Sequence, residues 1–130
     1  DRAMTEAGLE PKHVLTGDHS SFSLAHDLLE RALETHPTLD GVFCTNDDIA
    51  IGTMLSAQQR GIQVPQQLAV VGYNALDIGQ TISPKLTSVD TPRFKIGEKS
   101  AELLIGRLKG EAQEEKVVDM GYQITSGESV

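Results

Sequence analysis

At positions 40–52 the sequence runs Asp40-Gly-Val-Phe-Cys-Thr-Asn-Asp-Asp-Ile-Ala-Ile-Gly52. Its first half is a short apolar run of the length of a buried strand, and its second half begins a series of apolar residues at helical spacing. The polar residues between the two halves supply an N-cap, because a short side-chain oxygen can accept a hydrogen bond from a free N–H of the first turn. We therefore predict a strand, a tight turn and a helix that ends at Gly61.

Strand-like and helix-like segments alternate on both sides of this unit. Helix patterns cover residues 22–35 and 92–109, with one helical turn at 77–81, and strand patterns cover residues 13–16, 68–73, 86–89 and 116–124. This alternation predicts βαβ units with right-handed crossovers. The strand at 68–73 is apolar on both faces, which is typical of a parallel sheet covered by helices on each side. The predicted fold class is therefore α/β, with a parallel sheet flanked by helices.

Composition limits the classes of function. The 130 residues are 38% hydrophobic, which is enough for one modest core. The net charge of −8 disfavours nucleic-acid binding by this segment itself, because an acidic surface repels phosphates. The single cysteine, Cys44, excludes an internal disulfide framework and favours the cytosol. The first eight residues read as a helix already under way and stopped at Gly8, which indicates a piece of a longer protein.

Three polar clusters follow strand candidates, at residues 17–21, 46–48 and 74–77. The carboxyl ends of parallel strands reach one edge of a sheet, where small molecules bind in open α/β folds. We therefore predict a small-molecule site there. In the first cluster, His19 suits stacking on a ligand or plain surface exposure, and Ser21 suits a ligand contact or a helix cap.

The remaining candidates also have two interpretations each. Asn46 and Asp47 suit hydrogen bonds to a polyol, and both equally suit capping of the helix that follows. Asn74 suits ligand hydroxyls or the shaping of its turn, and Arg93 suits an anion contact or an ordinary helix start. Asp47 and Asp48 together suggest a divalent metal, but spacing positions no third ligand. Because the sequence contains no triad, zinc motif or phosphate loop, we predict no cofactor and no enzyme activity.

Several motifs resemble the lactose-repressor/galactose-repressor family of bacterial transcription regulators. Their order and spacing match over nearly the whole chain, and they are Gly41-Val-Phe-Cys-Thr-Asn-Asp-Asp-Ile-Ala-Ile-Gly52, Val64-Pro65, Leu68-Ala-Val-Val-Gly-Tyr-Asn74, Pro84-Lys-Leu-Thr-Ser-Val89 and Thr91-Pro92. The segments that most resemble the gluconate-utilisation repressor branch are residues 41–47, Thr91-Pro-Arg-Phe-Lys-Ile-Gly97 and residues 104–110. The resemblance implies a periplasmic-binding-protein-like (type I) fold, in which two α/β subdomains hold a sugar-type effector between them.

The resemblance also implies how the chain divides. Residues 1–91 and 117–130 correspond to the C-terminal subdomain, and residues 92–116 cross into an N-terminal subdomain that is mostly missing. The helix-turn-helix headpiece, through which such a repressor binds operator DNA, is absent from this sequence. The implied partners are a sugar or sugar-acid effector and a second copy of the chain.

By position, Asn46 matches the family's effector-binding asparagine, Asp47 follows it, and His19 matches a position that stacks on the sugar. Asn74 stands where sugar-binding members carry Asp, and Arg93 lies near the same site. Removing a negative charge and adding a positive one fits a sugar acid such as gluconate. The leading interpretation is the effector-binding and dimerisation part of a cytoplasmic repressor. The alternatives are a periplasmic sugar-binding protein of a transport system and, third, a metal-dependent transferase.

Overall fold

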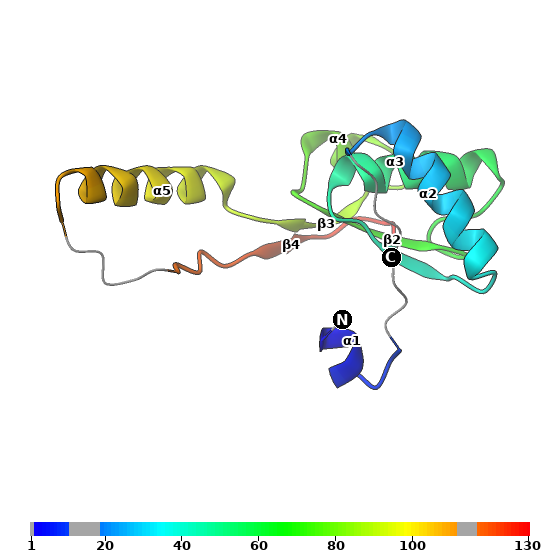
Figure 1. The fold of residues 1–130 in the computed structure, drawn as a ribbon. Helices are drawn as coiled ribbons and strands as arrows, with labels where there is room; N and C mark the ends of the chain where they lie inside the picture. The colour runs from blue at the N-terminus through cyan, green and yellow to red at the C-terminus, as the bar shows by residue number, and fades with distance from the viewer. Residues whose placement is uncertain (1, 11–18, 112–116) are drawn as a thin grey trace.

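The computed structural model describes residues 2–10, 19–111 and 117–130 (Figure 1). The predicted strand at 13–16 lies outside these residues. The elements in chain order are α1 (Arg2–Glu6), α2 (Phe22–Thr35), β1 (Gly41–Phe43), α3 (Asp47–Gln59), β2 (Ala69–Tyr73), α4 (Asp77–Thr81), β3 (Thr87–Asp90), α5 (Arg93–Leu108) and β4 (Gln123–Thr125).

The strands form one sheet in the order β1-β2-β3-β4. The first three strands are parallel, with Val42 opposite Val70 and Gly72 opposite Ser88. β4 is antiparallel to β3, with Val89 opposite Ile124. The α/β class with parallel strands flanked by helices is thus confirmed, but the sheet is mixed. The last strand runs the other way because the chain reaches it from beyond the carboxyl end of β3, after α5.

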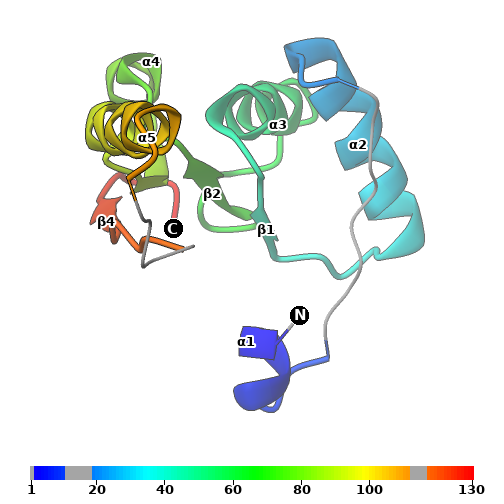
Figure 2. The same ribbon diagram turned by 60° about the vertical axis from the view of Figure 1, so that its left-hand side comes forward.

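Helix α3 lies over β1 and β2, and α2 packs along its side (Figure 2). Gly52 permits this close approach, since a Cβ there would come within 2.6 Å of the Ala25 Cβ and 2.9 Å of the Phe22 carbonyl oxygen. His26 Nδ1 and Ser56 Oγ, 2.9 Å apart, add a polar contact between the two helices. The helix pair is therefore held by tight backbone approach as well as by apolar burial.

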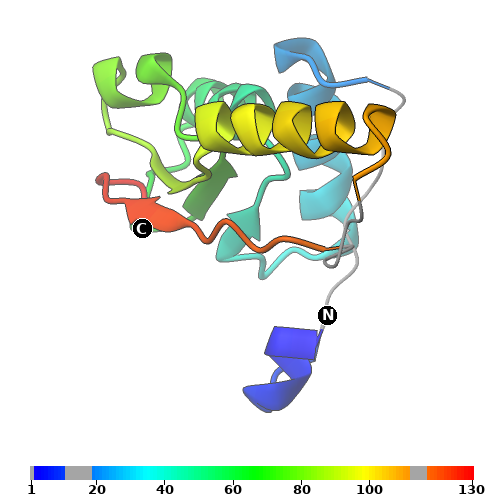
Figure 3. The ribbon, with the colours of Figure 1, turned by 90° about the vertical axis from the view of Figure 1, so that its left-hand side faces the viewer.

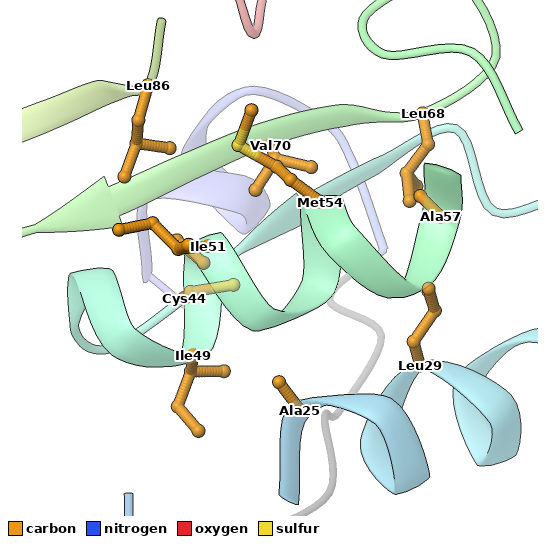
Figure 4. Close-up of a cluster of buried hydrophobic side chains, with 11 residues drawn as sticks. Ala25, Leu29, Cys44, Ile49, Ile51, Met54, Ala57, Leu68, Val70 and Leu86 are labelled. Atoms are coloured by element: carbon orange, nitrogen blue, oxygen red, sulfur yellow. The ribbon is translucent and has the colours of Figure 1, made fainter. Parts of the chain in front are cut away.

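The core lies between α3 and the sheet, with α2 closing its outer side (Figure 4). It contains Ala25, Leu29, Cys44, Ile49, Ala50, Ile51, Met54, Ala57, Leu68, Val70 and Leu86. Phe43 points to the other face of β1 and is 56% exposed. Among the described residues, Phe43 therefore lies outside the core between α3 and the sheet.

The carboxyl-terminal residues close the amino end of the parallel strands. Ser129 is fully buried, and its hydroxyl donates to the Val70 carbonyl (2.6 Å) and accepts from the Thr87 amide (2.9 Å). The Ser129 carbonyl in turn accepts from the Val70 amide at 2.8 Å. A Cβ on Gly127 would collide with the backbone of residues 85–87, so the tail passes very close to the start of β3.

Helix α5 stands apart from this body, beyond the carboxyl end of β3 (Figure 1; seen from that end in Figure 3). The paired strands β3 and β4 connect it to the rest of the molecule. Its apolar side chains are open to solvent: Phe94 is 83%, Leu104 60% and Leu108 79% exposed. Across the described ranges, no helix has the length and apolar character needed to cross a membrane.

Candidate functional site

Three of the predicted site residues follow the carboxyl ends of three neighbouring parallel strands. Asn46 comes after β1, Asn74 after β2 and Arg93 after β3. Backbone hydrogen bonds link these ends, from the Cys44 amide to the Val71 carbonyl and from the Asn74 amide to the Val89 carbonyl, both at 2.8 Å. The structure thus brings these positions to one edge of the sheet, which we call the carboxyl edge.

Asn46 is the N-cap of α3 and also ties a second loop to this edge. Its Oδ1 accepts from the Ile49 amide at 2.9 Å, and its Nδ2 donates to the Ser20 hydroxyl at 2.6 Å. The capping interpretation is therefore realised. The bond to Ser20 brings the loop before α2, which contains His19 and Ser21, to the same edge.

Ser21 is the N-cap of α2. Its Oγ accepts from the Leu24 amide at 3.1 Å and lies 3.0 Å from the Ser23 hydroxyl. His19 is exposed beside Ser20, in a position open to a ligand. A contact of either residue with the effector stays a prediction.

Asp47 lies beneath the carboxyl edge, not on its surface. The side chain is fully buried, with Oδ2 accepting from the Leu76 amide (2.5 Å) and Oδ1 accepting from the Ser88 hydroxyl (2.6 Å). As the first residue of α3, it also sits at the positive end of the helix dipole. These donors stabilise the buried carboxylate and leave it directed into the protein.

The turn after β2 has an unusual backbone. Asn74 has φ +110° and Ala75 has φ +48°, in the region that most side chains avoid. The Ala75 amide donates to the Ser88 hydroxyl at 3.1 Å, so Ser88 bonds both to this turn and to Asp47. Ser88 is not among the residues predicted for this site. Its signal is a hydroxyl between Leu86 and Val89 in a predicted strand, because a buried hydroxyl needs partners.

Arg93 begins α5 and its side chain is exposed. Pro92 occupies the N-cap position and provides no side-chain hydrogen bond to the first turn. The guanidinium and the helix dipole therefore place positive charge beside the carboxyl end of β3.

The structure gives no support to the metal alternative in the region it describes. Within residues 2–10, 19–111 and 117–130, no three His, Cys, Asp or Glu side chains gather in a way that could hold a metal ion. Both oxygens of Asp47 already accept protein hydrogen bonds. Burial raises the pKa of the Cys44 thiol to about 11, which keeps it protonated and unreactive near neutral pH.

Comparison with known proteins gives consistent matches. The model of the periplasmic binding protein-like domain family matches residues 1–130. The HTH-type transcriptional regulator GntR of Escherichia coli K12 is 42% identical over 130 residues, and the HTH-type transcriptional regulator IdnR of the same strain is 41% identical over 128. These matches cover 100% and 98% of this chain. The chain spans 39% of the length of either relative.

Solved structures agree with the sequence matches. The transcription regulator GntR from Chromobacterium violaceum superposes with a TM-score of 0.87 at 36% identity, over 98% of this chain and 48% of that one. A complex of the transcriptional regulator CelR with cellobiose superposes with a TM-score of 0.88 at 27% identity, over 99% and 40%. The fold is therefore shared with regulators, one of which was solved with a bound disaccharide.

Proposed function

Because the chain belongs to the periplasmic-binding-protein-like domain family and is a member of the lactose-repressor/galactose-repressor group of transcription regulators, we propose that it is the effector-binding and dimerisation portion of a cytoplasmic repressor. The proposed effector is a sugar acid of the gluconate type. The observation on which this rests is the meeting of Asn46, Asn74 and Arg93 at the carboxyl edge. In a chain with a net charge of −8, a basic residue at this edge is the feature that would favour an anionic effector.

The chemistry of these three side chains favours a polyhydroxylated anion. An amide both donates and accepts hydrogen bonds, as hydroxyl groups require, and it does not repel a carboxylate as Asp would. A guanidinium can bind a carboxylate through two parallel hydrogen bonds. Asn74 and Arg93 therefore supply the neutral and the positive parts of a sugar-acid site.

The position of α5 supports the proposed division of the chain. We infer that residues 1–91 and 117–130 form the C-terminal subdomain and that residues 92–116 cross into an N-terminal subdomain. The apolar side chains of α5 would pack there, and the effector would bind between the two subdomains. Its binding would shift the population toward a closed arrangement and change DNA binding by the headpiece.

A second apolar surface favours a homodimer. Leu55 on α3 is 47% exposed and Ile78 on α4 is 44% exposed. Leu55 borders a hollow of about 540 Å³ that Met54, Ile62 and Ile82 also line. Exposed apolar side chains beside a hollow are typical of protein interfaces, so we propose the surface around Leu55 as the contact with a second copy.

The alternatives have less support. The relatives named above are transcriptional regulators, so the transport-protein interpretation is not favoured. The same relatives indicate a protein that binds its ligand without transforming it.

The direct test is calorimetric titration of the full-length protein with gluconate, glucose and ribose. We expect gluconate to bind at least tenfold more tightly than either neutral sugar. Tighter binding of glucose or ribose would keep the effector-binding function but overturn the sugar-acid assignment. No binding of any of the three would contradict the proposed class of effector.

A further inference from the structure

We propose that Asp47 and Ser88 form a positioning pair that fixes the Asn74–Ala75 turn at the carboxyl edge and so sets effector affinity without contacting the effector. This inference rests on the proposed function above. It concerns two buried residues from different elements, the start of α3 and the second position of β3.

The hydrogen bonds around the pair hold two successive amides of the turn. The Ala75 amide donates to Ser88 Oγ at 3.1 Å, and the Leu76 amide donates to Asp47 Oδ2 at 2.5 Å. Ser88 in turn donates its own proton to Asp47 Oδ1 at 2.6 Å. Each side chain therefore holds one amide of the turn and also holds the other side chain.

The turn needs such restraint because of its backbone. Asn74 and Ala75 both have positive φ, and Ala75 has neither the freedom of glycine nor the polar side chain of asparagine. Conformations of this kind persist where the surrounding structure imposes them. The position of the Asn74 amide side chain at the carboxyl edge therefore depends on the hydrogen bonds that Ser88 and Asp47 accept from the Ala75 and Leu76 amides.

The neighbouring strand leaves space for the carboxylate. A Cβ on Gly72 of β2 would collide with Asp47 Oδ1 and with the side chain of Leu86. Ser88 also pairs with Thr125 of β4, on the two-stranded connection that leads to α5. The pair thus links the turn at the edge to the strands on which any movement of α5 depends.

The experiment uses the full-length protein and compares Ser88→Ala with Ser129→Ala. Both changes remove a hydroxyl that is at most 1% exposed and makes two hydrogen bonds. Ser129 bonds to Thr87 and Val70 near the amino ends of β3 and β2, whereas Ser88 bonds to Ala75 in the turn and to Asp47. Two quantities are measured for each variant: gluconate affinity by calorimetry, and hydrogen exchange of the Ala75 and Leu76 amides. Asp47→Asn is the third variant, which keeps the shape of the side chain and removes one acceptor.

We expect Ser88→Ala and Asp47→Asn to weaken gluconate binding about tenfold and to speed exchange at residues 75 and 76 about tenfold. Ser129→Ala should lower the melting temperature about as much as Ser88→Ala does. It should leave gluconate affinity and amide exchange at residues 75 and 76 within twofold of wild type. Equal loss of affinity in Ser88→Ala and Ser129→Ala, or unchanged exchange at the turn in Ser88→Ala, would overturn the inference. If the wild-type protein binds no gluconate, the proposed effector fails, and amide exchange alone decides for or against the positioning pair.

Discussion

Asp47 and Gly72 depend on each other at the centre of the molecule. The carboxylate is fully buried beside β2, and the space it occupies exists only because residue 72 has no side chain. A buried carboxylate is tolerated when its acceptors are satisfied, and Leu76 and Ser88 satisfy them here. A glycine in the middle of a strand therefore has a specific packing reason in this protein.

Gly72→Ala should lower the free energy of unfolding by about 3 kcal/mol, because the added methyl group forces Asp47 or Leu86 to move. Urea denaturation measures this. Gly41→Ala is the matched control in β1, where the new Cβ would meet Ala69 Cβ at an ordinary 3.8 Å. Equal stability of the two variants would show that the Asp47 carboxylate does not depend on the space beside Gly72.

Cys44 gives a prediction for alkaline pH. Burial raises the pKa of its thiol from an ordinary 9.0 to about 11, partly opposed by the contact with Thr53. Since the folded state holds the proton more tightly, the contribution of the thiol to stability is complete below pH 9 and is lost as pH rises from 9 through 11. At about 1.4 kcal/mol per pH unit, the full loss is about 3 kcal/mol.

Urea denaturation of wild type and Cys44→Ala at pH 8, 9, 10 and 11 tests this. The wild-type protein should lose more stability over the series than the variant, which has no thiol to ionise. Parallel loss in the two proteins would show that the Cys44 thiol does not resist ionisation in the folded state.

At the scale of elements, local sequence signals were sufficient to predict the helices α2, α3 and α4. The pattern predicted α2 at 22–35 and α4 at 77–81 with the observed bounds, and Asn46 was one of two predicted caps of α3. These signals are local, because apolar spacing and a capping side chain act within a few residues. The convergence of the clusters at 46–48 and 74–77 followed from their places after parallel strands. Arg93 was a candidate only if its loop lies at the same edge.

The remaining features depend on distant residues. The strand predicted at 116–124 is observed only at Gln123–Thr125, and it is antiparallel because of the path through α5. The role of Asp47 could not be predicted from its own neighbourhood, since its partners are 29 and 41 residues away. Hydrogen-bond partners of this separation leave no periodic signal in the sequence.

The cap of α2 allows a test that separates stability from binding. Ser21→Ala should lower the free energy of unfolding by about 1 kcal/mol, because the Leu24 amide loses its acceptor, while Ser21→Gly should cost only a few tenths. Ser23→Ala is the control, as Ser23 caps no helix. Urea denaturation gives the stabilities, and equal values for Ser21→Ala and Ser23→Ala would contradict the cap. A loss of gluconate affinity in Ser21→Gly would support the predicted effector contact.

At the scale of the whole molecule, the exposed apolar side chains of α5 require a partner surface. Leu104 and Leu108 lie one helical turn apart and are 60% and 79% exposed. In the proposed repressor this surface packs on the N-terminal subdomain. The isolated 130-residue chain lacks that cover, so hydrophobic association between copies becomes favourable.

We therefore expect the isolated chain to sediment as oligomers at micromolar concentration. The double variant Leu104→Glu/Leu108→Glu should reduce this association, because it places two carboxylates on the apolar surface. Lys95→Glu, an exposed change on the same helix, is the control for added negative charge. A monomeric wild-type chain in analytical ultracentrifugation would contradict the proposed role of this surface.

The central claim is that the carboxyl edge binds a sugar acid through Asn74 and Arg93. Titration of gluconate into full-length wild type, Asn74→Asp and Arg93→Ala tests it most directly. We predict that both variants bind gluconate at least tenfold more weakly, a change of about 1.4 kcal/mol, because each makes the site less positive. Gluconate affinity that is unchanged in both variants would place the effector elsewhere and contradict the assignment.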